Sequence, residues 1–288
     1  MVLSDSQNYI NNKQLVHKLL EFVDFDLTKT ILEVGPGKGI ITDALVKKQH
    51  KKIIAIETDP KLFSKLQKKY VDVINLLLIQ ADFLKYTMPN KPFIIVSNIP
   101  FNITANIVRK ITAEQSKMRA AYLIMQKEAA IKFIGAPHAH SPLLSHILNI
   151  NFKIKLLIDI DKSNYSPRPN FNTAFVSIKK RKKPIFTGKQ ELLFKDLLTY
   201  SFERRQVELG KALKQVMSSL QVKVMCKELG IEKEKSIKKI VFEDWVKIFN
   251  IFNEHTPSSS KRKVRGKYDK LLEEQNNLIK RNRTRKDV

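Results

Sequence analysis

Apolar and polar positions follow one pattern before the basic run Lys179–Lys183 and another after it. Short runs of β-branched and apolar residues come first and are expected to be strands: Thr30–Val34, Lys52–Glu57, Leu76–Gln80, Pro92–Asn98 and Ala120–Met125. The stretches between them carry helical spacing: Ile40–Lys48, Pro60–Tyr70 and Ala105–Ala113. This alternation predicts an open, doubly wound α/β domain. Two further β-rich segments, Asn149–Ile160 and Thr173–Ile178, are expected to extend the sheet as an antiparallel edge.

The second pattern predicts helices. Pro184 follows the five basic residues and marks a boundary. Beyond it, helical periodicity runs through four segments: Glu191–Arg205, Leu209–Leu220, Val222–Leu229 and Phe242–Phe252. We therefore expect an α/β domain over residues 1–180, a smaller helical domain over 184–255 and a basic tail over 256–288.

The charge balance favours a polyanionic partner. The 288 residues include 53 Lys or Arg against 28 Asp or Glu, a formal net charge of +25. Each phosphate that such cations neutralise releases condensed counterions, which favours nucleic acid. A membrane surface is the competing interpretation, but no apolar run approaches the ~20 residues that span a bilayer. The N-terminal residues carry no secretory signal pattern, so we expect a cytoplasmic protein and no membrane partner.

Neither cysteine nor histidine indicates a metal site. The single cysteine, Cys226, excludes a disulfide framework and a thiolate zinc cluster. His138, His140 and His146 lie near one another in sequence, but a further ligand is not evident, so we expect them to face RNA or solvent. The tail has eleven Lys or Arg against four Asp or Glu from Lys261 onward, and we expect it to be mobile without RNA. Alternatively, apolar residues could give it one helical face: Leu271, Leu272, Leu278 and Ile279.

A glycine-rich turn follows the first predicted strand. In Glu33-Val34-Gly35-Pro36-Gly37-Lys38-Gly39 the glycines alternate, whereas a nicotinamide-binding turn spaces them G-x-G-x-x-G. Glycines permit positive φ and close approach of a ligand. An ordinary strand-to-helix turn remains an alternative. The alternating spacing resembles an S-adenosylmethionine site, and we assign Gly35 and Gly37 to cofactor binding.

Acidic residues end the next two strands. Glu57, beside Thr58, is placed to accept bidentate hydrogen bonds from the two hydroxyls of an adenosine ribose. Asp82 is placed to accept a bond from the cofactor's adenine amino group while Phe83 packs beside it. Singly, each acid could be a solvated loop residue or a helix cap. Their positions on successive strand ends favour a common site, because ligands of open α/β sheets bind there.

The most specific motif is Asn98-Ile99-Pro100-Phe101, after an apolar strand. An exocyclic adenine amine is a poor nucleophile because its lone pair is delocalised into the ring. The Asn98 side-chain oxygen and the Ile99 carbonyl can accept both amino hydrogens and aim the nitrogen at a sulfonium methyl. Pro100 stiffens the loop, and Phe101 offers a face for adenine stacking. An Asn-x-Pro turn without chemistry is the alternative.

Together these motifs resemble the Erm family of ribosomal RNA adenine N6-methyltransferases, and more distantly the KsgA enzymes, over about residues 5–250. Ser6-Gln7-Asn8-Tyr9-Ile10 resembles the family's opening, which implies that Asn8 and Ile10 contact the cofactor, as Asn98 does. The segment from Tyr165 to Thr173 is similar to the family's F-x-P-x-P-x-V-x-S. This implies that Tyr165 faces Phe101 across the target adenine.

The resemblance implies a Rossmann-like class I methyltransferase fold and a monomeric enzyme that uses S-adenosyl-L-methionine. Its implied substrate is an adenine of 23S ribosomal RNA, mono- or dimethylated, which blocks macrolide, lincosamide and streptogramin B antibiotics. Alternatives are a KsgA-type enzyme acting on 16S RNA, a DNA adenine methyltransferase, or a non-catalytic nucleic-acid-binding factor. Ile99 and Phe101 favour Erm over KsgA, and Ile99 disfavours DNA. The run Lys179–Lys183 is a candidate phosphate contact, extended by four more cations: Arg109, Lys110, Lys127 and Lys132.

Overall fold

The computed structural model describes residues 9–48, 51–135, 142–203 and 207–284. The chain divides into two compact units: residues 1–131 with 152–181, and residues 132–151 with 182–288. The segment 132–151, which the sequence assigned to the α/β domain, therefore belongs to the helical unit. The reason is packing, because Ile150 lies in the helical core and its carbonyl accepts the Ile185 N–H at 3.1 Å.

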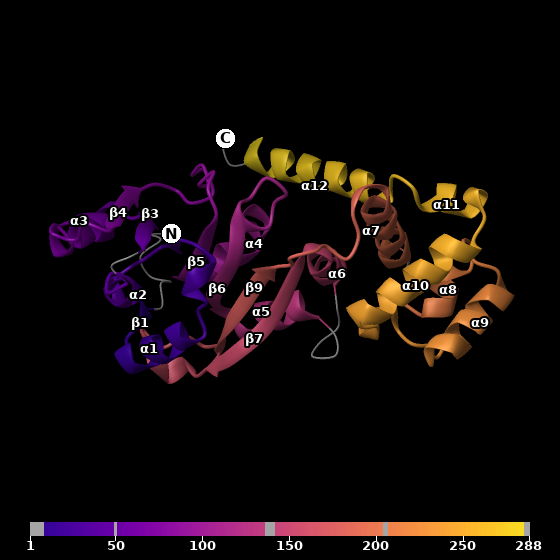
Figure 1. The fold of residues 1–288 in the computed structure, drawn as a ribbon, viewed down its shortest axis with the longest axis horizontal. Helices are drawn as coiled ribbons and strands as arrows, with labels where there is room; N and C mark the ends of the chain where they lie inside the picture. The colour runs from indigo at the N-terminus through magenta and orange to yellow at the C-terminus, as the bar shows by residue number, and fades with distance from the viewer. Residues whose placement is uncertain (1–8, 49–50, 136–141, 204–206, 285–288) are drawn as a thin grey trace. The chain divides into compact units, whose positions relative to one another are not determined.

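Unit 1 is built on a seven-stranded sheet in the order β4-β3-β2-β5-β6-β9-β7 (Figure 1). The strands are β2 (Thr30–Val34), β3 (Lys52–Glu57), β4 (Leu76–Gln80), β5 (Phe93–Asn98), β6 (Met118–Gln126), β7 (Phe152–Ile160) and β9 (Thr173–Lys180). Strands β2 to β6 pair in parallel, whereas β9 is antiparallel to both β6 and β7. The predicted parallel sheet with an antiparallel edge is confirmed.

The largest error in a predicted strand boundary is at the start of β7. Residues 149–151 end helix α6 (Leu143–Asn151) rather than begin β7. The side-chain amide of Asn149 donates to the Ser145 carbonyl four residues earlier, at 2.8 Å, a contact that adjacent helical turns allow and an extended strand does not.

Helices and a small second ladder complete unit 1. The helices are α1 (Lys13–Glu21), α2 (Ile40–Leu45), α3 (Pro60–Lys69), α4 (Thr104–Ile111) and the start of α5 (Lys127–Ile134), with short 3₁₀ turns at Phe25–Leu27, Phe101–Ile103 and Lys162–Asn164. Asp59 caps α3 by accepting two backbone N–H groups. Strand β1 (Tyr9–Ile10) pairs with β8 (Tyr165–Ser166), so Ile10 lies opposite Tyr165.

Unit 2 is helical: α6, α7 (Gly188–Glu203), α8 (Leu209–Leu213), α9 (Ser219–Leu229), a 3₁₀ turn at Ile237–Lys239 and α10 (Phe242–His255). Trp245 and Phe194 lie fully buried at its centre. The single helix predicted over Leu209–Leu220 is in fact two elements. Ser218 starts α9 with a capping box, exchanging hydrogen bonds with Gln221, and this forces a new helix start.

The tail is helical where it is described, which agrees with the alternative of a helical tail, and its mobility without RNA stays a prediction. Helices α11 (Ser258–Val264) and α12 (Lys267–Thr284) follow α10, and Figure 1 shows α12 beside α7. Val264 is fully buried in the helical core. The Asp196 carboxylate on α7 accepts N–H groups from Gly266 and Tyr268 at 3.2 and 3.0 Å. These contacts fix the start of α12.

His146 does not face RNA or solvent as expected. It lies in α6 with 1% of its surface exposed, and its ring packs against those of Phe202 and Trp245. Burial lowers its pKa to about 4, so it is neutral at pH 7. His138 and His140 lie outside the described residues. Among those described, His, Cys, Asp and Glu nowhere gather into a possible metal site, and none of the helices has the length and apolarity of a membrane span.

Candidate active site

Four of the sequence motifs meet at one edge of the sheet. Gly35, Glu57, Asp82 and Asn98 each lie at or just after the carboxyl end of β2, β3, β4 or β5, and these strands are parallel. The order of the strands reverses between β2 and β5, which is where open α/β sheets form their ligand crevice. The structure therefore brings together residues that lie far apart in the sequence.

Two glycines of the turn between β2 and α2 have no room for a side chain. Gly37 has φ +60°, and a Cβ there would lie 2.7 Å from Cε1 of Tyr9. Gly39 has φ +82°, and a Cβ there would lie 2.5 Å from the Tyr70 hydroxyl. Both positions demand glycine for conformation and for space. Tyr9, which packs on the turn, was not predicted from sequence, although it stands between the predicted contacts Asn8 and Ile10.

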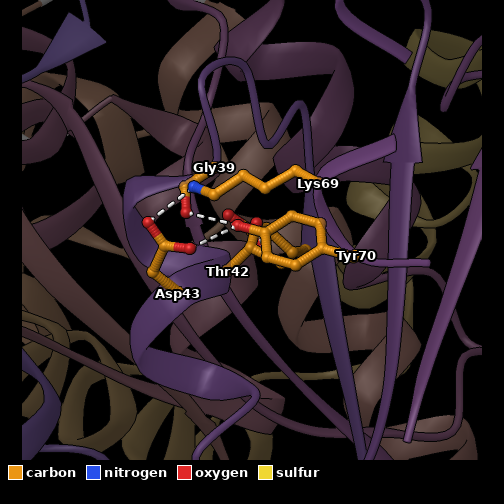
Figure 2. Close-up of polar contacts among 6 residues, drawn as sticks. Gly39, Thr42, Asp43, Lys69 and Tyr70 are labelled. Carbon is orange, nitrogen blue, oxygen red and sulfur yellow. Dashed lines mark hydrogen bonds and ion pairs between the residues drawn. The ribbon is translucent and has the colours of Figure 1, made fainter. Parts of the chain in front are cut away.

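A polar network anchors this turn (Figure 2). The Tyr70 hydroxyl, after α3, lies 2.9 Å from the Gly39 carbonyl and 2.8 Å from Oδ1 of Asp43 on α2. Lys69 Nζ donates to the other Asp43 oxygen at 2.7 Å. Burial, and then the bond to Asp43, raises the pKa of Tyr70, so its proton stays on the hydroxyl. The network ties the end of α3 to α2 and to the turn.

Glu57 is oriented by the backbone. It is 3% exposed; Oε2 accepts the Gly37 N–H at 3.0 Å, and Oε1 accepts the N–H groups of Thr58 and Asp59 at 2.9 Å each. A carboxylate offers about four acceptor sites, so the remaining one is on Oε2. One ribose hydroxyl can bind there directly. The bidentate contact expected from sequence would need a second hydroxyl to share Oε1 with these backbone donors.

A second buried acid, Glu33 on β2, was not assigned a role from sequence. It is 1% exposed and accepts a hydrogen bond from the Thr42 hydroxyl at 2.7 Å. Burial raises the pKa of Glu33 to about 8, against the opposing bond from Thr42. Glu33 is therefore mostly protonated at pH 7. It lines a pocket with residues of the turn, the N-terminal ladder, the start of α2 and the Asn98–Phe101 motif: Tyr9, Ile10, Gly35, Pro36, Lys38, Ile40, Ile41 and Asn98.

The loop after β5 is held on both sides. Ser97 Oγ donates to the Val34 carbonyl at 2.5 Å, and the Ile99 N–H donates to the Ile124 carbonyl at 3.2 Å. On the far side, the Thr104 hydroxyl donates to the Phe101 carbonyl at 3.1 Å. The loop is therefore fixed to β2, β6 and α4, with Asn98 lining the pocket beside the glycine-rich turn.

The ring that meets Phe101 is not the expected one. Phe101 and Phe171 make an edge-to-face contact, with ring centroids 5.2 Å apart at 83°. Tyr165 is 3% exposed and its hydroxyl lies 2.8 Å from the Thr173 hydroxyl. Phe171 was missed by the sequence analysis, although it fills the valine position of the segment that resembles the family. The clamp role assigned to Tyr165 stays a prediction.

Other predicted contacts differ in exposure. Asp82 is exposed, whereas Phe83 is 4% exposed and Ile10 is buried. Asn8 lies outside the described residues.

Two of the predicted phosphate-contacting cations are engaged within the protein. Lys127 forms an ion pair with Asp159 at 2.8 Å. Lys110 Nζ donates to two backbone carbonyls, whereas Arg109 beside it is exposed. Lys132 is exposed and Lys179 is half-buried.

Known proteins resemble this chain over most of its length. The sequence profile of the family described as "Ribosomal RNA adenine dimethylase" matches residues 3–254. An "rRNA adenine N-6-methyltransferase" of Bacillus licheniformis is 29% identical over 263 residues, which are 89% of this chain and 91% of the relative. A "Ribosomal RNA small subunit methyltransferase A" of Fusobacterium nucleatum is 27% identical over 252 residues, 85% of this chain and 95% of the relative.

Solved structures show the same fold. The 23S rRNA methyltransferase ErmE aligns with a TM-score of 0.79 at 21% identity, over 85% of this chain and 100% of the other. A dimethyladenosine transferase from Plasmodium falciparum aligns with a TM-score of 0.64 at 19% identity, over 85% and 97%. The fold is that of class I S-adenosylmethionine-dependent methyltransferases, with additional C-terminal helices. With the profile match over residues 3–254, the chain belongs to the ribosomal RNA adenine dimethylase family.

Proposed function

We propose that this protein transfers a methyl group from S-adenosylmethionine to the N6 amino group of an adenine in ribosomal RNA. The observation that carries the proposal is the convergence of the glycine-rich turn, Glu57, Asp82 and Asn98 at one edge of the parallel sheet. Membership of the ribosomal RNA adenine dimethylase family supports the same reaction.

The residues present fit the cofactor. The turn at Gly37 leaves no space for a Cβ, and Glu57 keeps an acceptor site on Oε2 for a ribose hydroxyl. Asp82 and Phe83 would hold the adenine, and Ile10 and Thr58 would line the site. When bound, S-adenosylmethionine supplies an electrophilic methyl group, whose bond to sulfur breaks as the bond to N6 forms.

The chain's part in the transfer is to hold the amine. The Asn98 side-chain oxygen and the Ile99 carbonyl accept the two amino hydrogens, which localises the lone pair on nitrogen and aims it at the methyl group. The bonds from Ser97 and Ile99 to neighbouring strands keep both acceptors in place. The nitrogen becomes acidic as the bond forms, so it can release its proton to water without a strongly basic side chain.

The base itself would stack on an aromatic surface. Phe101 is the proposed stacking face, Tyr165 the clamp implied by the family, and Phe171 a further wall because its ring already contacts Phe101. Each base stacked on an aromatic ring gains about 1–3 kcal/mol, which offsets the cost of extruding an adenine from RNA.

We prefer 23S over 16S ribosomal RNA as the substrate, with resistance to macrolide, lincosamide and streptogramin B antibiotics as the consequence. Ile99 and Phe101 support this preference. The net charge of +25 suits either RNA. A KsgA-type activity is the second candidate, supported by the small-subunit relatives. A monomer in the cytoplasm remains our expectation.

One assay separates the candidates. Labelled methyl transfer from S-adenosylmethionine would be measured with protein-free 23S RNA, assembled 30S particles and DNA, and primer extension would map the modified base. Label at one adenine of naked 23S RNA is expected. Label confined to 30S particles would indicate the KsgA-type reaction, and no label despite cofactor binding would indicate a non-catalytic factor.

A further inference from the structure

Lys110 holds the loop that follows β4. Its ammonium nitrogen, on α4, lies 2.8 Å from the Leu84 carbonyl oxygen and 2.5 Å from the Tyr86 carbonyl oxygen. The same nitrogen lies 5.3 Å from the centre of the Phe83 ring. One side chain thus contacts three residues of a loop that belongs to a distant part of the sequence.

The loop is the part of the site assigned to the cofactor's adenine. Within it, the Leu84 N–H donates to Oδ1 of Asp82 at 2.8 Å, and the N–H groups of Lys85 and Tyr86 donate to the Asp82 carbonyl at 3.0 Å. The carbonyls of Leu84 and Tyr86 accept hydrogen bonds from Lys110 instead. The orientation of Asp82 and Phe83 therefore depends on contacts that Lys110 completes.

Lys110 also joins this loop to the catalytic loop. Helix α4 begins at Thr104, directly after the 3₁₀ turn at Phe101–Ile103, and the Thr104 hydroxyl bonds the Phe101 carbonyl. Lys110 lies near the end of α4 and binds the loop after β4. One short helix therefore connects the loop after β4 with the Asn98 loop after β5.

We propose that Lys110 is a positioning residue that sets the adenine end of the cofactor site before the cofactor binds; this inference rests on the proposed function. Two of its three N–H donors are used by the loop carbonyls, which distinguishes it from the exposed Arg109. The sequence had suggested both residues as phosphate contacts. The structure separates them, because the Lys110 ammonium is bound to the loop carbonyls whereas Arg109 is exposed.

The test compares Lys110→Met with Arg109→Met in the full-length protein. The dissociation constant for S-adenosylhomocysteine is measured by calorimetry, and that for 23S RNA by filter binding at several salt concentrations. Lys110→Met is expected to weaken S-adenosylhomocysteine binding roughly 10- to 100-fold, because two charge-assisted hydrogen bonds that order the loop are lost. Its RNA affinity and salt slope should stay unchanged, while Arg109→Met should leave S-adenosylhomocysteine binding unchanged.

Kinetics distinguish positioning from general damage. In Lys110→Met the KM for S-adenosylmethionine should rise while kcat at saturating cofactor is retained, and backbone amides of the loop after β4 should exchange hydrogen faster. If Lys110→Met does not fold, Lys110→Gln, which keeps a donor, should bind S-adenosylhomocysteine with intermediate affinity. Unchanged S-adenosylhomocysteine affinity in the variant would overturn the inference, as would a loss confined to RNA binding with a shallower salt slope. Failure of the unmodified protein to bind S-adenosylhomocysteine would instead overturn the proposed function.

Discussion

Substituting Gly39 with alanine tests the physical account of the glycine-rich turn. The backbone there has φ +82°, and a left-handed conformation costs a residue with a Cβ about 1–2 kcal/mol. The new Cβ would also lie 2.5 Å from the Tyr70 hydroxyl and 3.0 Å from Cδ2 of Leu66. Overpacking of this kind costs about 1–3 kcal/mol. We expect Gly39→Ala to lower the free energy of unfolding of unit 1 by about 2–5 kcal/mol.

Gly35→Ala provides the matched control. Gly35 has φ +64°, but the nearest atoms to a new Cβ are those of Pro100 at an ordinary 3.7 Å, so only the backbone cost of about 1–2 kcal/mol should remain. Tyr70→Phe removes the hydroxyl that a Cβ at position 39 would meet, and it should recover part of the loss caused by Gly39→Ala.

Urea unfolding followed by far-UV circular dichroism gives the measurement. The single tryptophan, Trp245, lies in unit 2, so its fluorescence reports the helical unit separately. The reasoning fails if Gly39→Ala is no more destabilising than Gly35→Ala, or if Tyr70→Phe recovers nothing.

Three further outcomes are expected. Burial lowers the pKa of His146 in the folded state to about 4, from an ordinary value of 6.5, so the folded state disfavours protonation of this ring. The free energy of unfolding of the helical unit should therefore keep its full value above pH 6.5. It should fall by at most roughly 3 kcal/mol as the pH decreases from 6.5 towards 4. His146→Leu should make the free energy of unfolding less dependent on pH, as measured by urea unfolding followed by Trp245 fluorescence. The same pH dependence in the unmodified protein and in His146→Leu would contradict this prediction. Phe171→Val should lower kcat/KM for RNA about 5- to 30-fold with cofactor affinity retained, because an aromatic contact of about 1–2 kcal/mol is lost; an unchanged kcat/KM would refute that role. A chain ending at Thr256 should destabilise the helical unit, since it loses the buried Val264, and should bind RNA more weakly with a shallower salt dependence; an unchanged salt slope would refute a phosphate-binding tail.

Local sequence patterns predicted the strands of the site well. Three strands have the predicted bounds: Thr30–Val34, Lys52–Glu57 and Leu76–Gln80. Each is a run of mainly apolar residues, and glycine or polar residues mark its end. Parallel pairing then places their carboxyl ends together, which is why Glu57 and Asp82 could be assigned to one site from sequence alone.

Contacts between distant segments could not be predicted in this way. Nothing in the sequence around Tyr70 indicates that its hydroxyl lies against Gly39, and Lys110 resembles any cation on an amphipathic helix. The burial of His146 and of Val264 depends on how helices pack in unit 2, which periodicity does not specify. The start of α12 is fixed by Asp196, 70 residues earlier.

The central claim is that the Asn98 loop directs methyl transfer to the N6 atom of adenine. The most direct measurement incubates ribosomal RNA with labelled S-adenosylmethionine and either the unmodified protein or Asn98→Ala, digests the RNA and identifies the labelled nucleoside by mass spectrometry. We predict N6-methylated or N6,N6-dimethylated adenosine with the unmodified protein, and no labelled nucleoside with Asn98→Ala although it still binds S-adenosylhomocysteine. Label on a ribose hydroxyl or on another base, or full transfer by Asn98→Ala, would contradict the account.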